Sequence, residues 1–137
     1  MSTISPITRT FVMFGAVFGL IGVALGAFGT HGLRAYFDAN PSLEATFETG
    51  IQYHLIHALA LIGTAWAANT FTGNRSRRWT RAAGWLFVMG IILFSGSLYV
   101  LSMANVRFMG AVAPLGGVSF ITGWACLAIA AYVDNRP

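Results

Sequence analysis

Four long apolar stretches alternate with short polar segments along the chain, at residues 11–29, 51–71, 82–103 and 110–133. None of them contains Asp, Glu, Lys or Arg. Each is long enough to cross a hydrocarbon core of ~30 Å at a rise of ~1.5 Å per residue. Because lipid offers no hydrogen bonds to the backbone, each stretch must be helical. The pattern predicts an all-α membrane protein, a single domain (residues 1–137) that forms a bundle of four transmembrane helices.

The composition supports a lipid-facing surface. Hydrophobic residues make up 56% of the 137 residues, charged residues only 9%, and the mean hydropathy is +0.69. A soluble domain carries roughly a quarter charged residues, so this chain cannot coat itself for water. The first apolar stretch follows Arg9 but exceeds the ~7–15 apolar residues of a secretion signal, so we expect a true span.

The arginines predict the orientation. One side of a four-span protein holds Arg9, the loop at residues 72–81 and Arg136, whereas the other holds Arg34 and Arg107. The positive-inside rule therefore predicts a multi-pass protein of the cell inner (plasma) membrane with both termini in the cytoplasm. The loop arginines fit a topology signal and equally a contact with anionic lipid headgroups, rather than nucleic acid. They are Arg75, Arg77, Arg78 and Arg81.

The longest polar segment lies on the predicted outer side, at residues 30–50. Asn40-Pro41 is a favourable helix start, so the second helix is expected to begin there, outside the membrane. Gly50 is expected to mark a bend where this helix enters lipid. Residues 32–39, with Leu33, Tyr36 and Phe37, suit a short interfacial segment.

Glycines recur along the first helix at spacings of four and three residues, which places them on one seam. A seam without side chains lets a second helix approach closely. We expect it to pack inside the bundle, although part of it could dock another subunit. Its members are Gly15, Gly19, Gly22, Gly26 and Gly29.

Polar side chains that could carry chemistry gather in the predicted outer half. His54 and His57 share a helix face at a spacing of three, and we expect the set below to lie at a common depth. Either they hydrogen-bond across helices, or they hold a metal, haem, quinone or proton. Asp38, Glu44 and Glu48 could supply a carboxylate ligand, but from a segment whose path the sequence does not place. The histidine pair is therefore a weak metal signal, and we predict no metal site and no cofactor. The candidates are His31, His54, His57, Ser95 and Tyr99.

The sequence contains no recognisable catalytic arrangement, and we expect that the protein is not an enzyme. Ser95 and Ser97 have no triad partners, and the glycine-rich stretch GAFGTHG lacks the Lys-Ser/Thr ending of a phosphate loop. Cys126, the only cysteine, lies in an apolar run and suits a packing role.

Four blocks carry a family resemblance: VALGAFGTHGLRAYF, FETGIQYHLIHALALI, FSGSLYVLS and APLGGVSFITGW. Together they resemble the family called domain of unknown function 423, which includes bacterial inner-membrane proteins and animal transmembrane protein 256-like proteins. The resemblance implies a four-helix membrane bundle and transfers no catalytic residue. The family-like positions are Gly26, Gly29, His31, Gly32, Tyr53, His54, His57, Ser95, Gly96, Tyr99, Pro114, Gly116, Gly117, Gly123 and Trp124.

Two functions compete on these grounds. A compact bundle with glycine-rich faces and no complete reaction centre suits an accessory subunit or assembly companion of a larger membrane complex. Alternatively, the polar cluster makes the chain a small binder or transporter. Lipid and another membrane protein are the expected partners.

Overall fold

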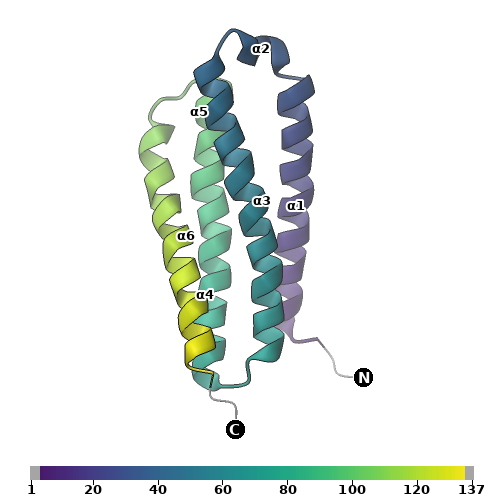
Figure 1. Cartoon of the computed structure of the whole chain (residues 1–137), viewed down its shortest axis with the longest axis vertical. Helices are drawn as coiled ribbons and strands as arrows, with labels where there is room; N and C mark the ends of the chain where they lie inside the picture. The colour runs from purple at the N-terminus through teal and green to yellow at the C-terminus, as the bar shows by residue number, and fades with distance from the viewer. Residues whose placement is uncertain (1–3, 135–137) are drawn as a thin grey trace.

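The helices expected from the apolar pattern lie side by side as four long rods in the computed structural model, which describes residues 4–134 (Figure 1). The prediction of an all-α fold is confirmed: no strand occurs within that range. Arg136 lies outside the described residues. The elements are α1 (Pro6–His31), α2 (Arg34–Asp38), α3 (Pro41–Thr70), α4 (Asn74–Gly90), the π-helix η1 (Ile91–Ser95), α5 (Gly96–Ala104) and α6 (Met109–Tyr132).

The third rod is a continuous helix of 31 residues, Asn74–Ala104, made of α4, η1 and α5. It lies between α3 and α6, and α1 packs along the other side of α3 (Figure 1). The largest apolar cluster fills the middle of this arrangement, with Phe11, Leu61, Phe87 and Phe120 almost fully buried. α1 packs mainly on α3 and touches α4 only lightly.

Three helices are long and apolar enough to cross a membrane: Pro6–His31, Asn74–Ala104 and Met109–Tyr132. The remaining long helix, α3, has 30 residues but is more polar along its first half. Its polar residues include Glu44, Glu48, Gln52 and His54 in that half and His57 just beyond it.

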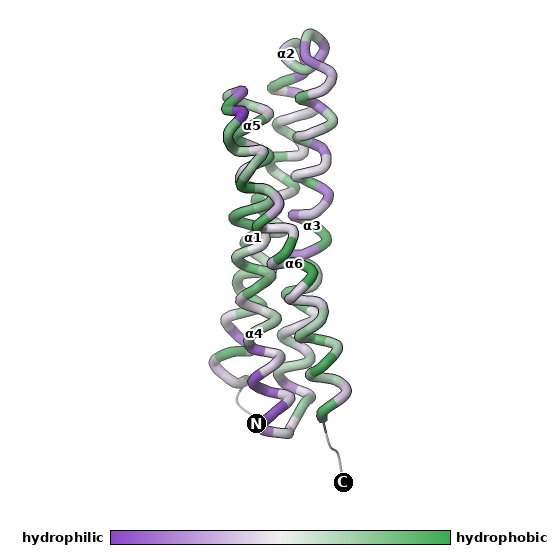
Figure 2. Tube along the Cα trace, turned by 90° about the vertical axis from the view of Figure 1, so that its left-hand side faces the viewer, coloured by the Kyte–Doolittle hydropathy of each residue, from purple (hydrophilic) through white to green (hydrophobic). Residues whose placement is uncertain are grey.

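Polar residues concentrate at the two ends of the bundle. Figure 2 shows hydrophilic colour at the start of α4 and around α2, with hydrophobic colour along much of the length between them. Large apolar side chains point outward from this middle zone: Leu20, Leu59 and Ile121 are 71%, 73% and 72% exposed. Such a surface suits contact with lipid rather than water.

The segment between α1 and α3 is held inside the protein. Phe37 of α2 is buried between Phe47 and neighbouring aromatic rings, and Tyr36 Oη donates to the Ser102 carbonyl at 3.2 Å. α3 begins at Pro41 as predicted, but the Asn40 side chain does not cap it. Asn40 Nδ2 instead donates to the Tyr36 carbonyl at 2.8 Å and closes α2.

Gly50 lies at a close contact between helices, and Pro114 lies inside a helix. A Cβ at Gly50 would meet the Tyr99 ring at 2.9 Å, so this glycine admits the close approach of α5. Pro114 does not delay the last helix, since α6 starts at Met109 and includes it. Pro114 is the sixth residue of α6, beyond the amides that lack an intrahelical acceptor, and prolines are tolerated inside membrane helices where neighbouring groups satisfy the freed carbonyl.

Candidate functional site

His57 sits at the centre of an aromatic group between α3 and α6. The ring is 3% exposed and stacks on Phe120 with centroids 3.5 Å apart. Trp124 Nε1 donates to His57 Nε2 at 3.1 Å, and the indole N–H can only donate. Nδ1 therefore carries the proton and donates to the Tyr53 carbonyl at 2.7 Å. Both ring nitrogens are engaged, so metal or proton binding here requires one of these bonds to break.

His54 is turned toward other neighbours. Its Nδ1 lies 2.9 Å from Tyr99 Oη on α5, and its ring meets Phe18 of α1 edge to face. A Cβ on Gly22 of α1 would lie 3.4 Å from the same ring. The two histidines share one helix but face α1 and α5 in one case and α6 in the other. They do not converge on one ligand.

Two buried polar atoms, His54 Nε2 and Ser95 Oγ, have no hydrogen-bond partner within residues 4–134. Ser95 is fully buried in η1, one turn before Tyr99 along the same rod. Buried donors and acceptors are normally satisfied, so Ser95 Oγ is available to a small polar ligand or to water. The His54 ring lies beside the Phe18 backbone, without a hydrogen bond of good geometry from Nε2. Within those residues no group of three or more His, Cys, Asp and Glu side chains is arranged to hold a metal ion.

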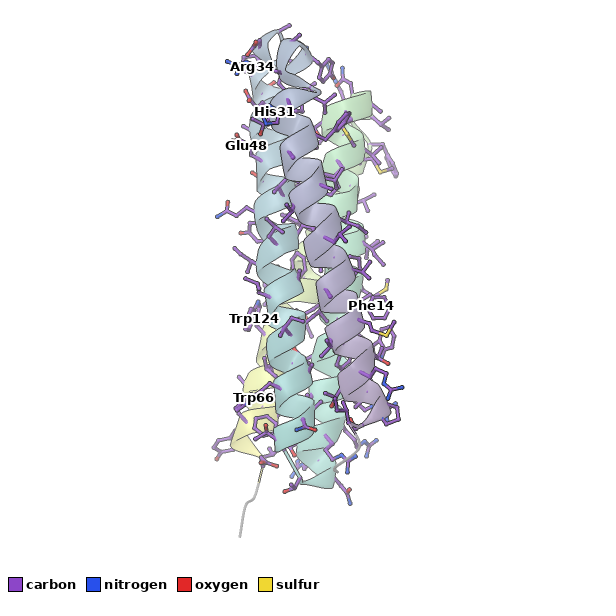
Figure 3. All side chains as sticks on the ribbon, turned by 90° about the vertical axis from the view of Figure 1, so that its right-hand side faces the viewer. Phe14, His31, Arg34, Glu48, Trp66 and Trp124 are labelled. Atoms are coloured by element: carbon purple, nitrogen blue, oxygen red, sulfur yellow. The ribbon has the colours of Figure 1, made fainter. Side chains whose placement is uncertain are left out.

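His31 does not join this cluster, and the expectation of a common depth is wrong for it. His54 packs at the level of Phe18 and Gly22, whereas His31 lies nine residues further along α1, about 13 Å at ~1.5 Å per residue. Figure 3 shows His31 at one end of the bundle, near Arg34 and Glu48. α3 begins at Pro41, ten residues before the apolar stretch that starts at residue 51, so this end of the bundle extends beyond the apolar stretches.

A pocket of about 520 Å³ opens at that end between α1, α2 and α3. Three carboxylates and one guanidinium line it, from Asp38, Glu44, Glu48 and Arg34. Sequence reasoning missed this gathering because the path of the outer segment could not be placed before the fold was known. Its other lining residues are Gly26, Gly29, Thr30, Phe37, Phe47, Ile51 and Gln52.

The glycine seam of α1 faces α3 at most of its positions. A Cβ at Gly15 would meet the Ala58 carbonyl at 2.9 Å, and one at Gly22 would meet Leu55 at 2.6 Å. Gly29 packs on the Phe47 ring, and Gly26 lies at the edge of the contact, 3.8 Å from Ile51. Gly19 differs, because a Cβ there would have no atom within 4 Å.

The four arginines of the α3–α4 region divide between two pockets. Arg77, Arg78 and Arg81 line one with the start of α1, and Arg75 lines another with Tyr132. Beside them, Asp134 Oδ1 accepts hydrogen bonds from the Thr72 and Gly73 amides and from the Ser76 hydroxyl, at 3.2, 3.1 and 2.8 Å. Sequence reasoning missed this link, which ties the end of α6 to the start of α4.

Long helices with an apolar exterior, polar ends and a buried histidine–aromatic network define the class: this is a small α-helical integral membrane protein. Residues 25–117 match the family model described as "Protein of unknown function (DUF423)". The chain belongs to this family, and the resemblance carried by the four sequence blocks is confirmed.

Two relatives named as UPF0382 membrane proteins align with this chain over almost their full lengths. The UPF0382 membrane protein YwdK of Bacillus subtilis is 43% identical over 90% of this chain and 96% of its own length. The UPF0382 inner membrane protein YgdD of Escherichia coli is 38% identical over 90% of each chain. No solved structure matches.

Proposed function

We propose that this protein spans the inner membrane four times with both termini in the cytoplasm. It serves as an accessory subunit or assembly companion of a larger membrane complex, without catalysis of its own. The observation that carries the proposal is an open face on α1 and α3 where two glycines have no packing partner within the bundle: Gly19 and Gly63.

The fourth span is α3. Its 30 residues reach about 45 Å at ~1.5 Å per residue, more than a hydrocarbon core requires. His54 and His57 are each 3% exposed, so its polar middle faces protein rather than lipid. The orientation rests on charge: four arginines of the α3–α4 region mark the cytoplasmic end, and the carboxylates of the outer pocket mark the opposite one.

The open face lacks an explanation inside the monomer. Glycine inside a helix costs roughly 0.5–1 kcal/mol relative to alanine, a cost that close packing normally offsets. A Cβ at Gly19 or Gly63 would meet no atom within 4 Å. Both glycines share a face with residues of the outer pocket. Gly19 lies eleven residues before Thr30, and Gly63 lies eleven after Gln52, a spacing of about three helical turns.

The occupant we assign to this face is a transmembrane helix of the partner that carries a basic residue just beyond its outer end. Glycines admit the backbone of such a helix, and dispersion over the close contact drives association in lipid. At the outer end, the pocket presents Asp38, Glu44 and Glu48 against Arg34 alone. This imbalance of charge is complementary to a partner arginine or lysine.

The test is purification of the tagged protein from its native membrane in mild detergent, with mass spectrometry of the material that elutes with it. We expect one membrane complex in stoichiometric amount with the wild type. Gly19→Leu and Gly63→Leu should abolish co-elution while the subunit itself stays folded. Gly96→Leu is the matched control, because Gly96 of α5 also has open space at its Cβ but lies on another helix. Elution of the wild type alone, or equal loss with all three variants, contradicts the proposal.

A second candidate is a small binder that uses the buried polar atoms near the outer side. The unpartnered His54 Nε2 and Ser95 Oγ favour it. Metal analysis and absorbance spectra of the purified protein test this candidate. A stoichiometric metal or chromophore that is lost in His54→Ala but retained in His57→Ala would support it.

A further inference from the structure

The cytoplasmic end carries a pocket of about 610 Å³ where three helix ends meet. The start of α1, the end of α3 and the start of α4 all contribute, and most of the lining residues belong to helices rather than to the connecting loop. Its shape is therefore set by the bundle. The lining residues are Ser5, Pro6, Ile7, Thr10, Ala68, Asn74, Arg77, Arg78 and Arg81.

The pocket is strongly basic. Three of its nine lining residues are arginines, and none is Asp or Glu. Three of the four acidic residues of the chain line the pocket at the opposite end, and the fourth, Asp134, accepts hydrogen bonds from the α3–α4 loop and Ser76. Guanidinium groups stay charged and bind phosphate oxygens in pairs of parallel hydrogen bonds. Three of them around one hollow create a site for an anion.

The positive ends of two helices reinforce this charge. α1 begins at Pro6 and α4 at Asn74, and both residues line the pocket. Helix N-termini favour negative charge because their first amides lack intrahelical acceptors. Thr10 and Asn74 add polar side chains among the arginines.

An apolar groove continues from the same pocket along α1. Thr10 lines both hollows, and Met13, Phe14 and Val17 complete the second, which has a volume of about 300 Å³. These four positions follow helical spacing and therefore share one face. Met13 and Val17 are 61% and 53% exposed, so the groove opens outward.

A tryptophan marks the passage from the basic pocket to the apolar groove. Trp85 lies four residues beyond Arg81 on α4, one helical turn deeper, and its ring packs edge to face on Phe14 at 5.6 Å. It is 44% exposed, as expected of an aromatic anchor at a membrane interface. From the basic pocket to the apolar groove, three guanidiniums, a threonine and an apolar run follow in order, with Trp85 in contact with Phe14 of that run. This is the order of a phospholipid headgroup and its acyl chain.

We infer that this surface is a binding site for an anionic phospholipid. The phosphate lies against Arg77, Arg78 and Arg81, and one acyl chain runs along Met13, Phe14 and Val17. A lipid with two phosphates fits best, because it neutralises two of three guanidinium charges. The inference is independent of the proposed partner complex, since the open face of Gly19 and Gly63 contributes no residue to this pocket.

Native mass spectrometry of the full chain in detergent tests the inference. The protein is titrated with diphosphatidylglycerol, phosphatidylglycerol and phosphatidylethanolamine that carry the same acyl chains. We expect one bound lipid per chain, with affinity falling in that order. Glycerol phosphate, which has no acyl chain, is the competitor that separates a lipid site from a phosphate site. Effective competition by it, or equal binding of phosphatidylethanolamine, overturns the inference.

Matched arginine variants locate the site. Arg78→Gln and Arg81→Gln should each weaken binding of the two-phosphate lipid about fivefold, the effect expected for one basic residue near an anionic headgroup. Arg75→Gln removes a charge from the same region but faces a different pocket, and should have no effect. Arg78→Lys keeps the charge without the paired geometry, and guards against loss of fold or topology. Equal weakening by Arg75→Gln would mean a diffuse basic surface and contradict a defined site.

Discussion

Trp124 Nε1 donates to Nε2 of His57 across 3.1 Å and thereby joins α6 to α3 near the middle of the bundle. The bond fixes the proton of the imidazole on Nδ1, which donates a hydrogen bond to the carbonyl of Tyr53. A residue that hydropathy alone would treat as a defect in a span is thus fully satisfied. It contributes to the cohesion of two helices that otherwise share few backbone contacts.

Removal of this bond should destabilise the protein modestly. Trp124→Phe keeps an aromatic ring against Phe87, which Trp124 meets edge to face at 5.0 Å, but leaves His57 Nε2 without its donor. We expect a loss of about 1 kcal/mol, since hydrogen bonds between membrane helices average roughly 0.6 kcal/mol and an unsatisfied buried acceptor adds to the cost. Thermal denaturation in detergent measures it. A double-mutant cycle with His57→Phe should give a coupling of similar size, and additive losses would contradict the interaction.

Two adjacent glycines of α6 should respond very differently to alanine. A Cβ at Gly116 would overlap the Phe94 backbone in η1, whereas one at Gly117 would meet only the Phe94 ring at 3.9 Å, an ordinary contact. Gly116→Ala forces the two helices apart. Overpacking a core costs about 1–3 kcal/mol in the free energy of unfolding, and we expect a loss at or above the upper end because backbone atoms must move. Gly117→Ala should be neutral. Yields of folded protein and denaturation midpoints in detergent compare the pair, and similar values would refute the packing described between α6 and η1.

The carboxylate of Asp134 should stabilise the end of the bundle where α3, α4 and α6 meet. Asp134→Ala removes the shared acceptor of the Thr72 and Gly73 amides and the Ser76 hydroxyl. A hydrogen bond to a charged group contributes about 1.5–3 kcal/mol, but solvent screening at this partly exposed site reduces each of the three, so we expect a total loss on the order of 2–3 kcal/mol. Asp134→Asn keeps an oxygen acceptor and should lose less. Hydrogen exchange at the Thr72 and Gly73 amides provides the local readout, and unchanged protection in Asp134→Ala would argue against the link.

Replacement of Ser95, unlike most of the substitutions above, should not destabilise the protein. Its hydroxyl is fully buried and has no partner within residues 4–134, so Ser95→Ala should leave stability unchanged or raise it. Ser102 is equally buried but donates to the Leu98 carbonyl at 2.7 Å, and Ser102→Ala serves as the comparison, with a loss of about 0.5–1 kcal/mol. A clear loss of stability in Ser95→Ala would show that its hydroxyl has a partner after all, such as a bound ligand or water.

Much of the fold follows from the sequence because the membrane restricts the alternatives to helices. The predicted stretch at residues 110–133 corresponds to α6, Met109–Tyr132, and the predicted start of the second helix at Pro41 is correct. The directions in which side chains point were harder to obtain. Gly84, Gly90 and Gly96 recur every six residues along one rod, yet Gly84 packs on Phe11 of α1, Gly90 on Phe120 of α6, and Gly96 on nothing within 4 Å.

The candidate site shows the same division. The three-residue spacing of His54 and His57 predicts that they share a face of their helix. It does not reveal that one ring meets Tyr99 and the other Trp124. Pairings across 45 and 67 residues depend on the relative rotation of whole helices. Asp134 was missed for the same reason, since its donors lie 58 to 62 residues earlier in the chain.

The π-helix at Ile91–Ser95 has a consequence for how this family can change during evolution. A π turn holds about one residue more than an α turn, so the part of the rod beyond it is rotated by about 100° relative to an uninterrupted helix. Tyr99 reaches His54 from beyond that turn. A one-residue deletion within the turn would restore regular α winding and leave Tyr99 directed at His54, because the lost residue and the regained winding compensate each other. Relatives that have lost this residue should therefore be able to keep both the histidine and the tyrosine, whereas regular winding without the deletion would turn the tyrosine away from the histidine.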